Sequence, residues 1–281
     1  MKYSYVKKEV EKAVAQANFC LRPDVKKALK NAYVNEKVPK AKKALGWILD
    51  NARIAKEEKI AICQDTGLPV VFIEAGGDSE VSGRLISTIE KGVESGYRKN
   101  FLRPSMVDAL DRSKPSYKGI VYHVNFSPKN KGLKITILPK GFGSENKSKL
   151  KMFNPTVELE EIEDFIVEAA KEAGAQSCPP FVIGVGIGGT CDSALLEAKR
   201  ALLERLDSSN SDKKLNRMEK KILSKVNSLE IGPMGLGGKC TVLAVKIRKI
   251  PTHIAGLPVG INISCHALRS SVVELKRPWR K

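Results

Sequence analysis

The fold prediction depends on a segment that reads Ile62-Cys-Gln-Asp-Thr-Gly67-Leu-Pro-Val-Val-Phe-Ile-Glu74. Its second half is β-branched and aromatic, and this predicts a strand that directly follows the cysteine-bearing turn. Residues 3 to about 60, before this segment, carry apolar side chains at helical spacing. Pro23 and Pro39 are typical of helix starts, because the first residue of a helix needs no N–H partner. A helical N-terminal layer is therefore expected.

The rest of the chain mixes helices and strands. Residues 120–126 and 133–138 predict two strands, and the polar turn at 128–132 predicts that they form a hairpin. Helices are expected at 79–97, from Asn154-Pro155 to Gly174, and at about 193–205. The polar segment Ser208–Asp212 is interpreted as a loop and not as a domain boundary. We expect an α+β fold with a mixed or antiparallel sheet, in one large domain that spans residues 1–281.

Composition excludes several classes of protein. The hydrophobic fraction is 42% and the charged fraction 28%, as in globular proteins. No run of about 18 apolar residues predicts a membrane span. The first residues lack the apolar stretch of a signal peptide, so a cytoplasmic location is expected. The six cysteines include no CxxC pair, which argues against a ribbon-type zinc site.

The chain is strongly basic. Its 49 basic and 31 acidic residues give a formal net charge of +18. Such a charge is compatible with nucleic acid, an acidic protein partner or an anionic substrate. Aromatic residues make up only 6% of the chain, and a single-strand binder needs aromatic platforms for the bases. Nucleic-acid and membrane binding are therefore alternatives that we do not favour.

A glycine-rich segment imitates a dinucleotide fingerprint. Gly184-Val-Gly-Ile-Gly-Gly189 satisfies the pattern GxGxxG between an expected strand and an expected helix. Its glycines lie inside the apolar run, however, and residues 193–230 contain no second strand that ends in an acidic residue. A nicotinamide-dependent oxidoreductase is thus a weaker alternative.

Four glycine- and cysteine-rich stretches interrupt the periodic pattern: 62–67, 140–146, 177–180 and 253–265. Each brings a cysteine, a polar side chain or exposed amides to a turn beside an expected strand, as active sites often do. Singly, each cysteine has a structural interpretation, since buried cysteines behave as small apolar residues. Taken together, the four stretches favour a functional site.

The first two stretches carry a family resemblance. Ile62-Cys-Gln-Asp-Thr-Gly67 is similar to the hallmark of the class I, iron–sulfur-dependent fumarase and L-tartrate dehydratase family. Residues 141–147 resemble the KGGGSxNK loop of that family, with departures at Phe142 and Glu145.

The remaining matches follow in family order. They are Cys178-Pro-Pro-Phe181 with Ile187-Gly-Gly-Thr190, which resembles CPPY…IGGT, then Gly235-Leu-Gly-Gly-Lys239, which resembles GxGGK, and finally His253 twelve positions before Cys265. The resemblance covers roughly residues 45 to 270.

The resemblance implies a cofactor and its ligands. Members of the family hold a [4Fe–4S] cluster on three cysteines, and the matching positions here are Cys63, Cys178 and Cys265. Three ligands leave one iron open as a Lewis acid for the substrate hydroxyl. The other cysteines, at 20, 191 and 240, match no ligand position and are interpreted as structural.

It also implies residues that act on the substrate. Gln64, Asp65 and Arg103 match positions that contact a dicarboxylate, and Arg103 offers a bidentate guanidinium. Gly143 can offer a backbone amide at close range. The catalytic roles fall to His253 and Asp65, whereas the histidines at 123 and 266 have no such support.

The implied activity is that of a hydro-lyase α subunit. We expect reversible hydration of fumarate to malate, with a separate β subunit supplying the catalytic base in a hetero-oligomer. L-tartrate dehydratase is the alternative, and mesaconate is a further possible substrate. On this expectation the α chain alone binds the cluster without appreciable turnover.

Overall fold

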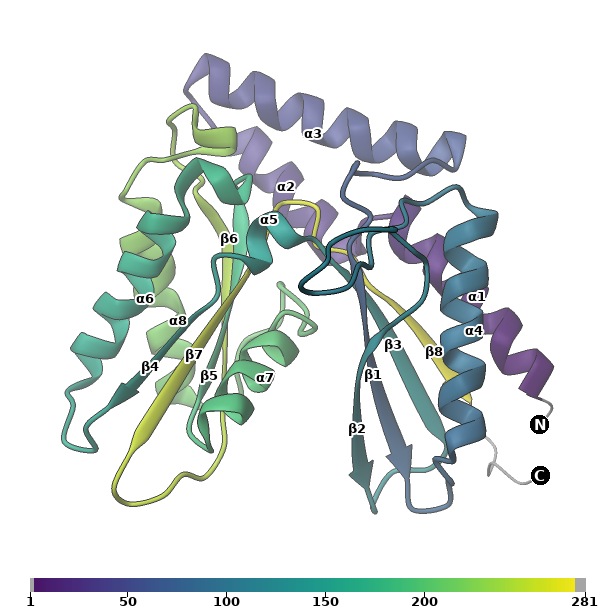
Figure 1. The fold of residues 1–281 in the computed structure, drawn as a ribbon. Helices are drawn as coiled ribbons and strands as arrows, with labels where there is room; N and C mark the ends of the chain where they lie inside the picture. Colours follow the sequence, from purple (N-terminus) through teal and green to yellow (C-terminus); the bar gives the residue numbers. More distant parts are fainter. Residues whose placement is uncertain (1–2, 276–281) are drawn as a thin grey trace. The chain divides into compact units, whose positions relative to one another are not determined.

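The computed structural model describes residues 3–275, and these residues form two compact units. Unit 1 comprises residues 3–22, 52–142 and 269–275, and unit 2 comprises residues 23–51 and 143–268. Both units combine helices with a four-stranded sheet (Figure 1). The prediction of an α+β fold is therefore confirmed. None of the described helices is long and apolar enough to cross a membrane.

The N-terminal part of the described chain forms three helices. They are α1 (Tyr3–Phe19), α2 (Pro23–Asn35) and α3 (Pro39–Glu58). Both prolines occupy the first helical position, as expected, because the ring fixes φ at a helical value and the missing N–H has no partner to lose there. The predicted N-terminal helices are confirmed.

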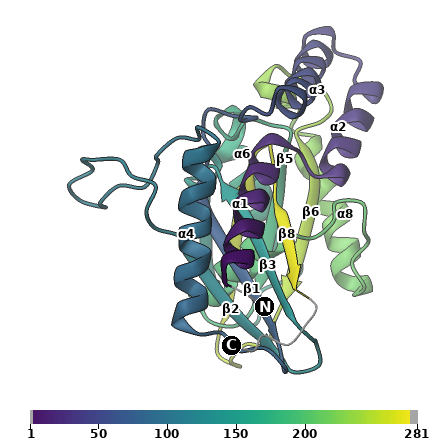
Figure 2. The same cartoon turned by 90° about the vertical axis from the view of Figure 1, so that its right-hand side faces the viewer.

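Unit 1 is built on a sheet with the strand order β2-β1-β3-β8. The strands are β1 (Leu68–Gly76), β2 (Val121–Ser127), β3 (Leu133–Lys140) and β8 (Ser271–Leu275). The helices α1 and α4 (Gly83–Lys99) pack against each other and share an apolar core with one face of this sheet (Figure 2). Val71, Ile73 and Ile135 point into that core. The segments just before β1 and just after α4 carry the candidate site residues of unit 1.

The expected hairpin is wrong. β2 and β3 are consecutive, but β1 lies between them, pairing parallel with β2 and antiparallel with β3. The burial explains this order, because Val70–Ile73 of β1 are all buried whereas β2 has no buried residue. A strand buried on both faces stabilises the sheet more as a central strand than as an edge strand.

Unit 2 has a sheet with the strand order β4-β7-β5-β6. The strands are β4 (Lys149–Phe153), β5 (Phe181–Ile187), β6 (Val242–Lys249) and β7 (Leu257–Ser264). The helices α6 (Leu159–Ala173) and α8 (Lys213–Asn227) bury their apolar sides in a core with Ile183, Ile261 and Ile263. The residues between these positions along β5 and β7 point to the opposite face, where α7 (Cys191–Ala201) packs.

Glycines bring α7 unusually close to the sheet. A Cβ at Gly184 would lie 2.1 Å from the carbonyl oxygen of Ala198, and one at Gly186 would lie 2.1 Å from that of Ala194. Both glycines lie inside β5 and not in a loop after it. Helix packing therefore accounts for them, and the segment 184–189 needs no dinucleotide to explain it.

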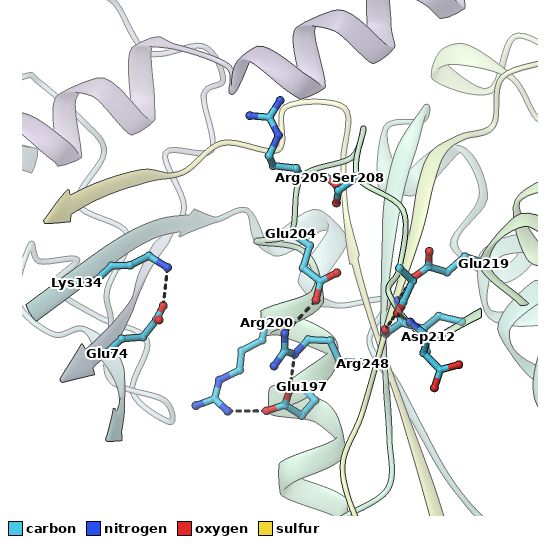
Figure 3. Close-up of polar contacts among 12 residues, drawn as sticks. Glu74, Lys134, Glu197, Arg200, Glu204, Arg205, Ser208, Asp212, Glu219 and Arg248 are labelled. Carbon is cyan, nitrogen blue, oxygen red and sulfur yellow. Dashed lines mark hydrogen bonds and ion pairs between the residues drawn. The ribbon is translucent and has the colours of Figure 1, made fainter. Parts of the chain in front are cut away.

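An ionic cluster fastens α7 to the neighbouring strand β6 (Figure 3). The carboxylate of Glu197 accepts hydrogen bonds from Arg200 and from Arg248, each at 2.5 Å, and Arg248 also reaches Glu204 at 3.0 Å. Burial opposes the charge of Glu197, but the two guanidinium groups outweigh it and hold the pKa of this carboxyl below its ordinary value.

The helix expected from Asn154 begins later. α6 starts at Leu159, after Glu158. Asn154 instead turns the chain, because its side-chain oxygen accepts from the amide and the hydroxyl of Thr156 at 3.3 and 3.1 Å. This local turn offers the backbone an alternative to the helix.

Candidate metal and dicarboxylate site

The first cysteine lies on a bend between α3 and β1, in unit 1. Cys63 is half-buried, and its thiol donates a hydrogen bond to the exposed side chain of Gln64 at 3.3 Å. Behind the bend lies Tyr97 of α4, which is fully buried. Its hydroxyl is within hydrogen-bond distance of the carbonyls of Thr66 and Gly67, at 2.9 and 3.0 Å. The residues that follow Cys63 are thus held from the core side.

Asp65 fixes the same bend through its carboxylate. One oxygen accepts from the amide of Gly67 at 2.9 Å, and the other accepts from the amide of Phe142 at 2.7 Å. The buried guanidinium of Arg269 donates to the backbone carbonyl of Asp65 at 2.6 Å. Asp65 therefore ties the bend after Cys63 to residue 142, next to Gly143 in the chain.

Arg103 is brought to the same bend. The hydroxyl of Thr66 accepts from the amide of Arg103 at 3.1 Å and lies 3.4 Å from its carbonyl oxygen. Its side chain is exposed, so the guanidinium is available to an anion. Four residues predicted for the site, Cys63, Gln64, Asp65 and Arg103, thus belong to one connected part of unit 1.

Unit 2 brings the other two cysteines together. Cys178 precedes β5 and Cys265 follows β7, and these neighbouring strands pair with Val182 opposite Ser264. The carbonyl of Cys178 accepts from the amide of His266 at 3.3 Å and lies 3.0 Å from Nδ1 of the same residue. Cys178 has φ 50° and ψ 66°, a left-handed turn just before the cis Pro179-Pro180 bond. Both cysteines are half-buried.

The chemistry of this pair fits a soft metal centre. None of the six cysteines, all of which lie in residues 3–275, forms a disulfide that would compete for the thiols. The hydroxyl oxygen of Ser177, next to Cys178, is buried and has no hydrogen-bond partner within the described part of the chain. A buried hydroxyl is normally paired, and a thiolate or sulfide beside Cys178 would accept from it. Among residues 3–275, no group of three or more His, Cys, Asp and Glu side chains is arranged to hold a metal ion, and the three-cysteine set stays a prediction.

His253 does not lie beside the cysteine pair of its own chain. It is exposed in the loop before β7, where its Nδ1 accepts from the amide of Ala255 at 3.1 Å. Cys265 follows the other end of β7, whose eight residues span about 26 Å in an extended strand. The eight residues of β7 thus make up most of the spacing between His253 and Cys265, and they separate the two side chains.

The remaining cysteines fit structural roles. Cys20 packs against the core of unit 1, and Cys191 is exposed at the first turn of α7. Burial raises the pKa of the Cys240 thiol to about 12, which keeps it protonated and unreactive.

Several residues of the site were not predicted from the sequence. Tyr97 reads as one more apolar position of an amphipathic helix, and Arg269 has no motif around it. Arg269 follows Cys265 by only four positions. Its closeness to an expected metal ligand is the one sequence feature that could have indicated a role in the site. His266, for which the resemblance gave no support, contacts the backbone carbonyl of Cys178.

The fold and the site define a class of protein. The chain is an α+β protein in which the half-buried Cys178 and Cys265 lie where β5 begins and β7 ends, on two neighbouring strands of one sheet. That arrangement is typical of an enzyme with a sulfur-ligated metal centre.

Comparison with known proteins gives the family. The model of the fumarate hydratase (fumerase) family matches residues 7–274, and the chain belongs to this family of hydro-lyases. It is 41% identical to the "Putative L(+)-tartrate dehydratase subunit alpha" of Methanocaldococcus jannaschii, over 93% of this chain and 94% of the relative.

Two more distant relatives support the same family. The "Putative fumarate hydratase class I" of Geobacillus stearothermophilus is 30% identical over 93% of this chain, which spans 53% of that longer protein. The L(+)-tartrate dehydratase subunit alpha of Escherichia coli is 27% identical over 79% of this chain and 75% of its own length. The predicted family and the predicted α-subunit type are thereby confirmed.

Proposed function

We propose that the chain is the α subunit of a hydro-lyase that interconverts fumarate and malate. The observation that carries the proposal is the pairing of Cys178 with the Cys265–His266 segment, in a chain matched by the fumarate hydratase family over residues 7–274. Cys63, Cys178 and Cys265 would hold a [4Fe–4S] cluster. When bound, such a cluster supplies an open iron as a Lewis acid for the substrate hydroxyl.

The chain's own residues would bind and orient the substrate. Arg103 would pair with one carboxylate through its exposed guanidinium, and Gln64 would donate an amide N–H. The backbone amide of Gly143 would contact the other carboxylate. Asp65 would position the bend that carries Cys63 and Gln64, because both its oxygens already accept backbone amides. A catalytic role of His253 remains a sequence-based prediction, because β7 lies between it and Cys265 within one chain.

The catalytic base would come from a separate β subunit in a hetero-oligomer. Two relatives carry the name of an alpha subunit, and this supports a partner polypeptide. The six free cysteines fit a reducing compartment, which supports a cytoplasmic location. We infer that the α chain alone would hold the cluster but would not turn over substrate at an appreciable rate.

Dehydration of L-tartrate is the second candidate. The 41% identity to a relative named for tartrate favours it, whereas the relative named for fumarate is 30% identical. Rates of the combined subunits on fumarate, malate, L-tartrate and mesaconate would decide between the two. The substrate with the highest kcat/KM identifies the activity, and no turnover of any of the four would refute both.

The cluster is tested by anaerobic reconstitution of the full chain with iron and sulfide. We expect a broad visible absorption band and about four irons per chain. Cys63→Ser, Cys178→Ser and Cys265→Ser should each weaken or abolish the band, and the exposed Cys191→Ser is the matched control. Correctly folded wild type that binds no cluster in the presence of its β subunit would overturn the ligand assignment.

A further inference from the structure

One carboxylate organises residues 143–148 of unit 2, which lie in the short helix α5 (Phe142–Glu145) and in the turn between α5 and β4, and which we call the Gly143 loop. Glu145 accepts from Nζ of Lys199 on α7 at 2.6 Å and from Nδ2 of Asn262 on β7 at 2.8 Å. Asn262 is 2% exposed, and the Lys199 side chain is 19% exposed. An ion pair so far removed from solvent is screened less than a surface pair, so it can hold its partners in place.

The contacts of Glu145 close into a ring. Nδ2 of Asn262 also donates to the hydroxyl of Ser148 at 2.9 Å, and that hydroxyl donates to the backbone carbonyl of Glu145 at 2.7 Å. The amide of Ser148 reaches the same carbonyl at 3.0 Å. Side chain and backbone of Glu145 are therefore fixed against β7 together.

The Gly143 loop is fastened to both segments that carry the paired cysteines. Asn262 lies three residues before Cys265 on β7. At the other attachment, Nζ of Lys147 donates to the side chain of Gln176 at 2.5 Å, two residues before Cys178. The position of the loop relative to the two cysteines thus depends on these side-chain contacts.

The glycine of this loop is not explained by packing. Gly143 is exposed and its φ is not positive, and a Cβ built on it would meet only the carbonyl oxygen of Gln176 at 4.0 Å. Neither strain nor crowding requires a glycine here. A residue without a side chain does, however, leave its backbone amide open to close approach by a ligand.

We propose that Glu145 is a positioning residue, which holds the exposed backbone of Gly143 in register with the Cys178–Cys265 pair, so that the Gly143 amide can receive a carboxylate of the substrate. The inference rests on the proposed function for the identity of that ligand. Lys199 and Asn262 are the two anchors through which Glu145 acts.

Hydrogen exchange of the full chain tests the positioning without any activity. The reporters are the amides of Lys147 and Ser148, which bond to the carbonyls of Ser144 and Glu145. Glu145→Gln and Lys199→Met should speed their exchange about tenfold. The control is Glu172→Gln, which removes an exposed ion pair with Lys149 from the same unit. Unchanged exchange in Glu145→Gln would overturn the proposal.

Kinetics of the reconstituted complex test the link to substrate. Glu145→Gln should raise KM for the dicarboxylate about tenfold, with kcat within about threefold and the cluster absorption per chain unchanged. Lys199→Arg should restore most of the affinity lost in Lys199→Met. An unchanged KM in a variant that keeps its cluster would overturn the positioning role, and so would loss of the cluster from Glu145→Gln. Failure of the wild-type complex to act on dicarboxylates would refute the proposed function, whereas the exchange experiment judges the role of Glu145 independently.

Discussion

The hydroxyl of Tyr97 shows how one buried side chain supports a functional bend. It lies in the core of unit 1, yet it lies within hydrogen-bond distance of two carbonyls just after Cys63. Backbone carbonyls in a buried turn need partners, and no strand or helix supplies them here. A phenol supplies both apolar packing and a donor, which explains why phenylalanine would not do the same at this position.

Tyr97→Phe should destabilise the protein by about 1–3 kcal/mol, because it leaves buried carbonyls without a donor. The measurement is the free energy of unfolding in urea at neutral pH. Tyr122→Phe is the matched control, since Tyr122 is 45% exposed and its change should cost less than about 0.5 kcal/mol. Equal stabilities of the two variants would show that the hydroxyl of Tyr97 does not support the bend.

The same residue predicts an alkaline loss of stability. Burial raises the pKa of Tyr97 far above its ordinary value of about 10. The folded state therefore keeps a proton that the unfolded state releases, so stability is fully present below about pH 10 and falls as the pH rises further. Subtracting the pH profile of Tyr97→Phe from that of the wild type should isolate this loss, and a pH-independent difference would contradict the assignment.

At the scale of single residues, the sequence pointed to candidate metal ligands and substrate-binding residues. It did not point to the residues that hold their backbone in place. Within unit 2 the Cys178 backbone bonds to the segment after Cys265, and within unit 1 Arg103 bonds to the bend after Cys63, whereas a common site of all these residues stays a prediction. Tyr97, Arg269 and Asn262 were missed, because each looks like an ordinary helix or strand residue until the fold brings it to a loop far away in the chain. The site role of His253 stays a prediction, and its spacing from Cys265 does not reveal that the strand β7 lies between the two residues.

At the scale of elements, α7 depends on the absence of side chains beneath it. The carbonyl oxygens of Ala194 and Ala198 occupy the space that Cβ atoms at Gly186 and Gly184 would need. The small residues Ala194, Ala198 and Ala201 of α7 are fully buried at this contact. The close approach also brings Lys199 of α7 within reach of Glu145, so packing of this helix and order in the Gly143 loop are linked.

Gly186→Ala should therefore be strongly destabilising, by about 2 kcal/mol or more, because either α7 or β5 must move. The urea midpoint and the exchange of the Ser148 amide would both report the change. Gly83→Ala is the control, since nothing lies within 4 Å of its Cβ position at the start of α4. A Gly186→Ala variant as stable as the control would show that α7 does not pack as described.

Element types were predictable where one residue type sets them locally. Pro23 and Pro39 marked the starts of α2 and α3 correctly. The pairing partner of a strand was not predictable in the same way, because β1, β2 and β3 follow one another in the chain but lie in the order β2-β1-β3 in the sheet. That order is decided by which strand is buried on both faces, a property of the assembled sheet that no turn sequence encodes.

At the scale of the whole molecule, neither unit is one continuous segment of chain. Unit 2 combines residues 23–51 with residues 143–268. Asp24 accepts from the amide of Leu206 at 2.8 Å, and Glu36 accepts from the amide of Lys239 at 2.9 Å. Both carboxylates are buried. The α2 region thus supplies partners that the longer segment cannot supply for itself.

This organisation predicts the behaviour of fragments. Residues 143–268 alone should unfold without a sharp transition and bind a hydrophobic dye, because the surface covered by α2 becomes exposed and two buried amides lose their acceptors. Residues 23–51 joined to the same segment by a long Gly/Ser linker should recover a cooperative urea transition, since the entropic cost of a longer loop grows only slowly. The two proteins would be compared by circular dichroism at equal concentration. A cooperative transition of equal midpoint in the shorter fragment would show that the α2 region is dispensable, and that the carboxylates of Asp24 and Glu36 do not stabilise the unit.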